Sequence, residues 1–308
     1  MTDAPAASGP WTVAVGGDTV TAVVRAHTGE PWSQVKRWVE RGKVFVDGAV
    51  ATAIDARVKA GQVVELRLAA PRPRDEKREA TIVFDDAHVV VIDKPAGISS
   101  VPYDTRETGT AMDLIRGAWK RMGRAASSVP LHVVHRIDRA TSGLLMFAKT
   151  KSAERALGEQ LRAHDVDRLY WCAAHGVVTA RTIESSLVED RGDGLRGSTH
   201  HAGQGKHAVT HVRVVRALRG ATLCEVQLET GKTHQIRIHL SEAGHPLVGE
   251  PVYIRDYENS GQRVIAAPRL MLHALTLGFV HPATGAKVSL RAEPPADFTA
   301  VLAALGDR

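Results

Sequence analysis

The sequence predicts an α+β protein with two parts, a small N-terminal module of helix and strand and a larger, sheet-rich domain. Three observations support this prediction. The 308 residues exceed the usual length of a single domain. A charged segment with two prolines interrupts the chain near residue 75. After this segment, short apolar runs of strand length outnumber the stretches with helical spacing.

The N-terminal module spans residues 11–70. Its expected elements are a helix over Ser33–Glu40, a strand over Lys43–Val46, a turn at Asp47-Gly48 and a strand over Gln62–Leu68. Ser33 is of the residue type that caps helix N-termini. The apolar residues Val35, Trp38 and Val39 follow at helical spacing, so we expect them to share the buried face of this helix.

Two segments outside the module are expected to lack regular structure. Residues 1–10 are rich in Ala, Ser, Pro and Gly, which indicates a disordered tail. Residues 71–80 carry two prolines and seven charged side chains within positions 71–79, a composition that no core accepts. We therefore expect a linker there, followed by the larger domain over residues 81–308.

The larger domain contains eight strand-like runs and three helical patterns. The runs are Ile82–Phe84, Val89–Ile92, Leu131–Val134, Leu144–Ala148, Val209–Val215, Leu223–Leu228, Leu270–Val280 and Val288–Ala292. The helices are expected after Thr110, with Met112, Ile115, Trp119 and Met122 on one face; after Ser152, with Ala156, Leu157 and Leu161; and from Thr233 to before Gly244, with Ile236 and Leu240.

Composition and charge restrict the partners, the metal sites and the cellular location that we expect for the protein. The chain has 40 Lys and Arg against 34 Asp and Glu, and this net charge of +6 favours a polyanionic partner. Two cysteines are too few for a disulfide framework. The pair His200-His201 fits no zinc spacing and lies in Gly192–Gly205, which we expect to be a flexible loop, so we expect no metal. Without a signal peptide or an apolar run of 18 residues, the protein is expected to be cytoplasmic.

The segment from Leu131 to Leu145 carries the most chemical information. An apolar run leads into a polar turn with Arg-x-Asp and Thr-Ser-Gly, and a second apolar run follows. Arg136 and Arg139 flank Asp138 closely, and Gly143 permits tight backbone geometry beside it. From the residues alone, a polar hairpin whose aspartate caps the turn explains the pattern equally well.

The eleven residues H-R-I-D-R-A-T-S-G-L-L, positions 135–145, closely resemble the signature of the RluA-like RNA pseudouridine synthases. Further segments resemble motifs of the same family in the same order: V-I-D-K-P-A-G at 91–97, T-G-K-T-H-Q-I-R-I-H-L at 230–240, and the stretches 244–253, 270–274 and 281–285. The resemblance covers about residues 81–298.

The resemblance implies a reaction, the isomerisation of uridine to pseudouridine within RNA, which needs no cofactor. It implies that Asp138 is the catalytic carboxylate, that Arg237 pairs with it, and that Tyr170 stacks on the flipped base. An ionised carboxylate suits either nucleophilic attack or proton abstraction at a sugar, and the sequence does not choose between them. The resemblance further implies substrate contacts by Arg136, His135, Thr141, Lys232, His234 and Gln235.

The chain departs from the family pattern outside the proposed catalytic residues. Lys232 stands where Arg is usual, Glu250 where Asp is usual, and Arg168 where Lys is usual. These differences bear on contacts with the substrate more than on the chemistry.

The N-terminal module resembles the S4 RNA-binding domain, through its basic helix, the turn V-F-V-D-G and the later K-A-G-Q-V-V. The fold expected is therefore a pseudouridine synthase domain preceded by a small α+β S4-like domain. The resemblance implies that Lys36, Arg37, Arg41 and Lys43 face RNA phosphates. Charge alone is equally consistent with a solvated helix face.

The expected function is pseudouridine synthesis in structured RNA. An S4 module commonly accompanies action on large-subunit ribosomal RNA, and transfer RNA is the alternative substrate within the same family. A second class of function is a non-catalytic RNA-binding or ribosome-assembly protein, although Asp138, Tyr170 and Arg237 are all present. We expect a monomer whose partner is RNA and not a membrane.

Overall fold

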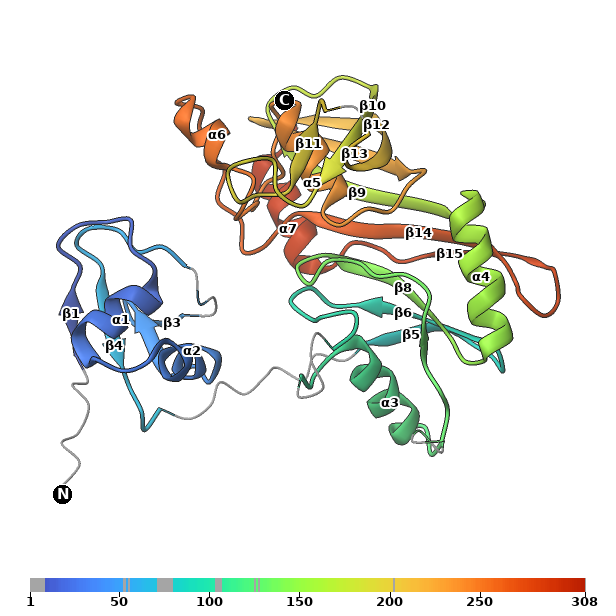
Figure 1. Cartoon of the computed structure of the whole chain (residues 1–308), viewed down its shortest axis with the longest axis horizontal. Coiled ribbons are helices and arrows are strands. Elements are labelled where there is room, and N and C mark those ends of the chain that lie inside the picture. The colour runs from blue at the N-terminus through green and yellow to red at the C-terminus, as the bar shows by residue number, and fades with distance from the viewer. Residues whose placement is uncertain are drawn as a thin grey trace. The chain divides into compact units, whose positions relative to one another are not determined.

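The chain forms two compact units in a computed structural model, Met1–Lys77 and Arg78–Arg308 (Figure 1). The structure describes residues 9–51, 54, 56–70, 80–102, 107–124, 126, 128–201 and 203–307. Apart from Gly9, Pro10 and Ala80, the expected tail and linker lie outside the described residues. No helix in the described ranges is long and apolar enough to cross a membrane.

The N-terminal unit is a four-stranded antiparallel sheet with two helices. Its elements are β1 (Trp11–Thr12), α1 (Val20–Thr28), α2 (Trp32–Glu40), β2 (Val44–Val46), β3 (Ala49–Val50) and β4 (Val63–Leu66), and the strand order is β1-β4-β2-β3. Valines from both helices and the sheet form its core, among them Val24, Val35 and Val64. The expected stripe of Val35, Trp38 and Val39 is buried, which confirms the period of this helix.

This unit differs from the sequence expectations in strands β1 and β3, which were not expected, and at both of its helices. Helix α1 was not expected, although Thr19 caps it by accepting from the Ala22 N–H and Gly29 ends it in a left-handed conformation. Its valines and threonines favour strands by propensity, and packing overrides that preference. The expected cap Ser33 is wrong: α2 begins one residue earlier, and the Pro31 carbonyl accepts its first hydrogen bonds.

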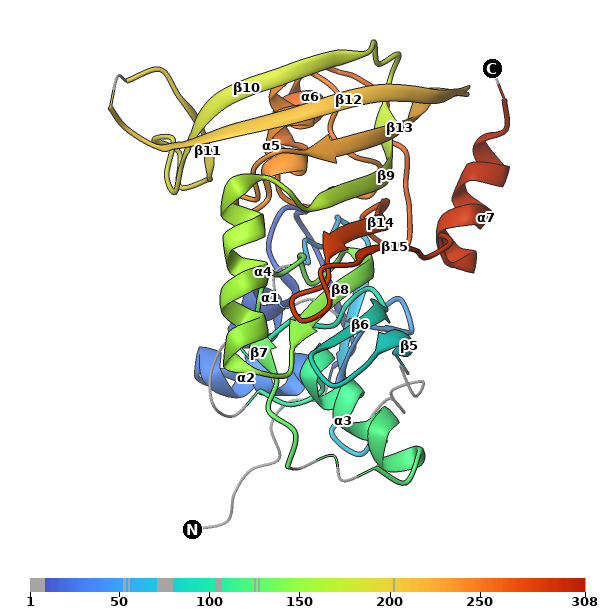
Figure 2. The ribbon, with the colours of Figure 1, turned by 90° about the vertical axis from the view of Figure 1, so that its right-hand side faces the viewer.

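The larger unit is built on a mixed sheet of eleven strands. Its strands are β5 (Thr81–Asp85), β6 (Val89–Lys94), β7 (His132–Val133), β8 (Ser142–Ala148), β9 (Asp167–His175), β10 (Arg181–Val188), β11 (Gly197–Thr199), β12 (Lys206–Leu218), β13 (Ala221–Leu228), β14 (Leu272–Val280) and β15 (Lys287–Arg291). The main order is β11-β10-β12-β13-β9-β14-β8-β6-β5, with β15 on β14 and β7 on β8. Figure 2 shows β10 and β12 at one end of this sheet and β5 and β6 at the other.

Within the described part of this unit, five helices accompany the sheet. They are α3 (Ala111–Arg121), α4 (Lys151–Ala163), α5 (Gln235–Glu242), α6 (Arg255–Asn259) and α7 (Ala296–Leu305). Thr110 caps α3 as expected, with a full capping box to Asp113. Met122 does not share the buried face of α3, because the helix has ended by then and the side chain is exposed.

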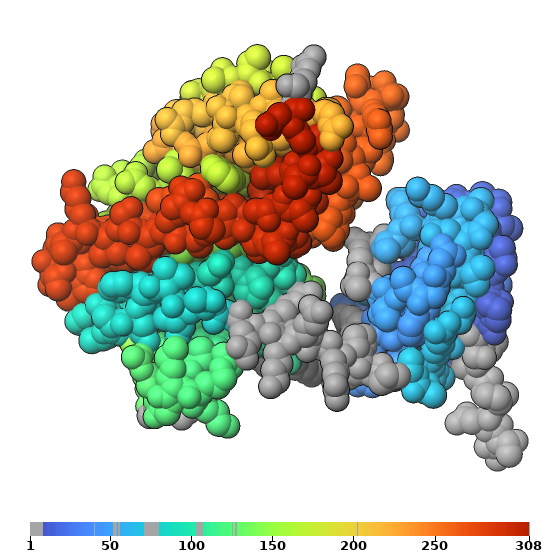
Figure 3. Space-filling model, turned by 180° about the vertical axis from the view of Figure 1, so that it is seen from behind, coloured from blue at the N-terminus to red at the C-terminus, as the bar shows by residue number. Residues whose placement is uncertain are grey.

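All eight expected strand runs coincide with strands, but three strands were missed: β9, β10 and β11. The expected loop Gly192–Gly205 is wrong at its centre, because β11 pairs there with β10. Helices α6 and α7 were also missed. Figure 3 shows α7 and the β14–β15 hairpin, in red, on the surface of this unit.

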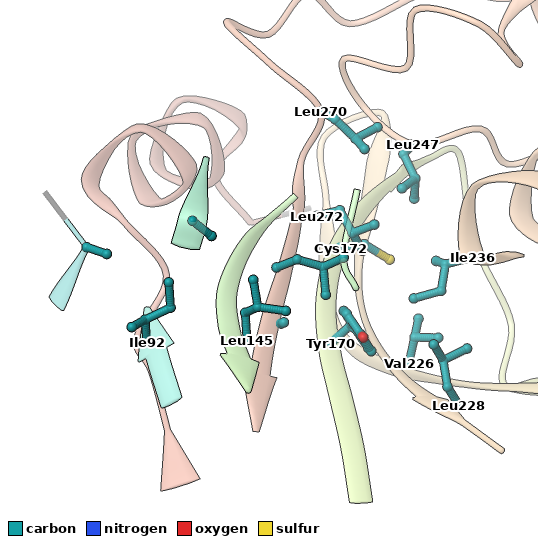
Figure 4. Packing of buried hydrophobic residues seen from close by; sticks show 14 of the residues in the cluster. Ile92, Leu145, Tyr170, Cys172, Val226, Leu228, Ile236, Leu247, Leu270 and Leu272 are labelled. Carbon is teal, nitrogen blue, oxygen red and sulfur yellow. The ribbon is translucent and has the colours of Figure 1, made fainter. Parts of the chain in front are cut away.

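The main hydrophobic cluster positions the helix that follows the T-G-K-T-H-Q segment. Ile236 and Leu240 of α5 pack with Tyr170, Cys172 and other residues of β9 and β13 (Figure 4). Because two residues one turn apart are held by this core, the orientation of α5 is fixed. Arg237, next to Ile236, therefore has a defined direction.

Candidate active site

A pocket of about 570 Å³ opens in the larger unit where the turn before β8, the end of α4, strand β9 and the segment leading into α5 meet. Five Arg or Lys side chains line it, and Asp138 is the only carboxylate among the described residues that do so. Such a pocket has room for a nucleoside and a positive potential that attracts an anion.

The backbone around Asp138 is anchored on both sides. Before it, Ser100 Oγ donates to the Ile137 carbonyl at 2.7 Å and accepts from the Ile137 N–H at 3.1 Å. After it, the Arg139 carbonyl accepts from the Gly97 N–H at 2.7 Å and from the fully buried Lys94 ammonium at 3.3 Å. These contacts fix the turn, so the direction of the Asp138 side chain is set before any ligand binds.

Gly143 allows β8 to approach β14 beside this turn. Its φ of +107° is rare for other residues, and a Cβ there would lie 2.2 Å from the Ala274 carbonyl oxygen. The neighbouring Ser142 hydroxyl contacts His273 Nδ1 at 2.9 Å across the same strand pair. The Ser-Gly step after Asp138 is thus needed for the sheet itself.

Two buried charged residues, Glu250 and Arg237, connect to Asp138 through successive contacts. Arg237 Nη1 lies 3.4 Å from Asp138 Oδ2, while Nε and Nη2 of Arg237 donate to Glu250 at 2.8 and 2.7 Å. Glu250 Oε1 also accepts from the backbone N–H groups of Val252 and Tyr253 at 2.9 and 3.3 Å. A bidentate pair of this kind holds the guanidinium plane in one orientation.

The ion pair between Glu250 and Arg237 keeps Arg237 charged. Burial opposes ionisation of Glu250, but the hydrogen bonds and charge of Arg237 outweigh it, so the pKa of Glu250 is lowered. Burial also works against the charge on Arg237, and Glu250 more than compensates, so its pKa is raised. The side chain of Asp138 remains 20% exposed, which leaves one edge of the carboxylate open to the pocket.

Tyr170 lies on β9 and lines the same pocket, 7% exposed and packed in the main hydrophobic cluster. Figure 4 shows it between Leu145 and Val226. Burial raises the pKa of its hydroxyl, and the charge of Arg168 acts in the opposite direction. The tyrosine is therefore neutral at ordinary pH, with its ring held rigidly in the pocket wall.

All six expected substrate contacts line the pocket: Arg136, His135, Thr141, Lys232, His234 and Gln235. His234 adopts a left-handed conformation, φ +58°, and its Nδ1 lies 2.7 Å from the Tyr253 hydroxyl. Its Nε2 is 3.9 Å from Asp138 Oδ1. Burial lowers the pKa of His234, although the charge of Asp138 opposes this shift.

His135 and Gln235 line the pocket but use their polar atoms within the protein. His135 Nε2 accepts from the Met146 N–H at 3.1 Å, and burial lowers its pKa to about 3. Gln235 accepts two hydrogen bonds from Thr230 and Lys232, and donates two to Val209 and Thr210. All four positions of its amide are used, so this side chain holds the loop.

The four basic residues expected to contact RNA all lie in the N-terminal unit, on α2 or just after it. Arg37 and Arg41 are exposed, and Lys36 Nζ lies 5.3 Å from the centroid of the exposed Trp32 ring. Lys43 donates to the Ala70 carbonyl. The described part of the chain holds no group of three His, Cys, Asp or Glu side chains arranged for a metal ion.

Sequence reasoning missed the roles of Glu250 and Tyr253 in this site. Both lie in the stretch 244–253 that resembles the family pattern, so the signal was present. What the sequence did not show is that Glu250 reaches back to Arg237 while Tyr253 contacts His234.

Comparison with known proteins decides the family. Residues 88–242 match the model of the RNA pseudouridylate synthase family. The chain belongs to this family. It is 35% identical to the uncharacterized RNA pseudouridine synthase YlyB of Bacillus subtilis, over 90% of this chain and 91% of that protein. It is 36% identical to the ribosomal large subunit pseudouridine synthase D of Pseudomonas aeruginosa, over 89% of this chain and 87% of that protein.

A solved structure of a similar protein supports the same family. Human RNA pseudouridylate synthase domain containing 4 superposes with a TM-score of 0.58 at 26% identity, over 73% of this chain and 92% of that one. The protein is an RNA pseudouridine synthase, which confirms the expected enzyme class, the RNA substrate and the sheet-rich mixed α/β fold.

Proposed function

We propose that this synthase modifies uridine in large-subunit ribosomal RNA, with Asp138 as its catalytic carboxylate. The observation that carries the assignment is the geometry of Asp138. It is the one pocket-lining carboxylate among the described residues, on an anchored turn, 3.4 Å from a guanidinium that Glu250 holds in place. The relatives named ribosomal large subunit pseudouridine synthase D support the choice of RNA.

The chemistry requires the N1–C1′ bond of uridine to break, the base to turn, and C5 to bond to C1′ before its proton moves to N1. Asp138 would either attack C1′ or take a proton from the ribose, and Arg237, whose Nη1 lies 3.4 Å from Oδ2, would hold the carboxylate in place for either step. The target uridine must first leave the RNA helix, because C1′ and C5 are not reachable in a stacked base. Tyr170 would then stack on the flipped uracil.

The N-terminal unit would supply affinity for RNA. We assign residues 11–70 to an S4-like RNA-binding domain, 71–80 to a linker and 81–308 to the catalytic domain. Support comes from the compact unit around its own valine core and from the exposed Arg37 of α2 and Arg41 just after it. Lys36 and Lys43, both half-buried, would add positive charge beside these arginines, as a phosphate backbone requires.

One chain should suffice for activity, since the described pocket is lined by one unit of one chain. Action on ribosomal RNA would place the enzyme in the cytoplasm. We therefore propose a cytoplasmic monomer.

Pseudouridine maps of ribosomal and transfer RNA, from cells with and without the gene, test the substrate. We expect at least one large-subunit position to lose its pseudouridine on deletion and to regain it when the gene is restored. Loss confined to transfer RNA would support the alternative substrate. Unchanged maps, together with tight and salt-sensitive RNA binding by the purified protein, would support the non-catalytic alternative.

A further inference from the structure

Arg168 is a buried cation in the pocket, and none of the described acidic side chains pairs with it. The residue is 7% exposed, on β9 two positions before Tyr170, and its side chain lines the pocket. No ion pair joins it to an acidic side chain of the described residues. A buried charge without a counter-charge is costly, so such residues are retained where a ligand completes them.

The hydrogen bonds of Arg168 are also incomplete. Its Nη2 donates to the Glu229 carbonyl at 2.8 Å and more weakly to the Leu228 carbonyl at 3.5 Å. Its Nε–H is buried and has no partner within the described structure. Two backbone carbonyls orient the guanidinium without neutralising it, and part of its donor capacity is unused.

The depth of Arg168 distinguishes it from the other cations of the pocket. Arg136 and Arg162 are exposed and Lys232 is half-buried, so these three can meet phosphates that stay in solvent. Arg237 is already paired with Glu250. Arg168 lies beneath the loop that leads into α5, where a Cβ on Gly231 would come within 2.6 Å of its Nη1. A group that meets this guanidinium must enter the pocket, as a flipped base does.

We propose that Arg168 binds the uracil ring and stabilises its negative charge while the base is detached from the ribose. When the N1–C1′ bond breaks, its electron pair leaves with the base, and the charge spreads over N1, O2 and O4. The charge is used again when C5 forms its bond to C1′, and the C5 proton then moves to N1. This inference rests on the isomerase activity and not on the identity of the RNA.

The surroundings of Arg168 agree with this role. Its charge favours the ionised form of Tyr170 and the neutral form of His135, so its field already reaches groups on two sides of the pocket. A preorganised cation in a water-poor site stabilises developing charge far more than a solvated one does. The family residue at this position, lysine, carries the same charge with fewer donors.

Single-turnover kinetics of Arg168 variants test the proposal, on an RNA that the wild-type enzyme modifies. Arg168→Met should lower the rate constant at saturating RNA by about 100-fold or more, because a donor aimed at transition-state charge is lost. The dissociation constant for RNA should change less than about threefold. Arg168→Lys should keep the charge and lose only part of the rate. Arg155→Met, which removes an exposed cation of α4 outside the pocket, is the matched control and should match wild type.

RNA that carries 5-fluorouridine separates an electrostatic role from a structural one. Fluorine withdraws electrons and stabilises the uracil anion, so the rate defect of Arg168→Lys in consuming this base should be smaller than its defect on uridine. Arg168→Lys is expected to fold, so this comparison holds even if Arg168→Met melts at a lower temperature. Equal defects of Arg168→Lys on both bases, or weakened RNA binding with an unchanged rate, would overturn the proposal.

Discussion

At the scale of single residues, the site depends on a series of ion-pair contacts in which Glu250 holds Arg237 and Arg237 contacts Asp138. We call this series the Glu250–Arg237–Asp138 relay. Glu250 and Arg237 are nearly inaccessible, with 0% and 6% of their side chains exposed, while Asp138 keeps 20%. A buried pair is stable only when both members are present, because either one alone would be an uncompensated charge. Glu250 is thus a positioning residue for the proposed catalytic aspartate.

Glu250→Gln tests this relay. The amide keeps the shape but not the charge, so Arg237 should turn toward Asp138 or lose its fixed plane. We expect a loss of about 3–5 kcal/mol in unfolding free energy and a fall in single-turnover rate. Chemical denaturation and single-turnover assays measure both, and Glu250→Asp, the residue usual in the family, should retain most of each. Full stability and rate in the glutamine variant would exclude the relay.

His135 makes the free energy of unfolding depend on pH, and its lowered pKa fixes the sign of that dependence. The folded pKa is about 3, below the ordinary 6.5, so the unfolded chain binds a proton first as pH falls. The stability that neutral His135 contributes is complete above pH 6.5 and is lost progressively toward pH 3. Between pH 7.5 and 5 the loss should be about 2 kcal/mol.

His135→Gln isolates this contribution, since the glutamine carbonyl can still accept from the Met146 N–H. Denaturation curves at pH 7.5 and 5 should show the stability advantage of wild type over the variant shrinking in acid. An advantage that stays constant or grows would show that His135 is not held neutral.

At the scale of elements, the sequence identified those whose pattern is local. Thr110 with Asp113 marks the start of α3, and the runs Val89–Ile92 in β6 and Leu144–Ala148 in β8 are continuously apolar because both faces are buried. Strand β10 carries polar residues at most positions, and its pairing with β12 is set by the sheet. No local signal specifies such a strand.

Gly143→Ala tests the close approach of β8 and β14. The new Cβ would meet the Ala274 carbonyl oxygen at 2.2 Å, on a backbone with φ +107°. We expect a loss of at least about 2 kcal/mol in unfolding free energy. Gly117→Ala in α3, where a Cβ meets only the end of Arg121 at 3.6 Å, should be neutral or slightly stabilising. Equal stability of the two variants would contradict the packing described for β8.

At the scale of the whole molecule, the sequence indicated two units and the order of the motifs. It could not supply the contact between Asp138 and Arg237, which are 99 residues apart. That pairing came from the family resemblance, and the fold provides it through the position of α5 on the hydrophobic cluster. The resemblance did not imply the contact between Glu250 and Arg237, which only the structure shows.

A triple variant tests the proposed division of labour between the two units. Changing Lys36, Arg37 and Arg41 to Ala should weaken RNA binding and reduce the slope of log affinity against log salt concentration by up to about three units. The single-turnover rate at saturating RNA should be unchanged, because the pocket lies in the other unit. Wild-type affinity and salt slope in this variant would remove the RNA-binding role of α2.

The most direct test is a comparison of purified wild-type and Asp138→Asn enzymes on ribosomal RNA from cells that lack the gene. If Asp138 supplies the essential carboxylate, only the wild type forms pseudouridine, while both proteins melt alike and bind the RNA with similar affinity. Pseudouridine formation by the asparagine enzyme at the wild-type rate would contradict that role.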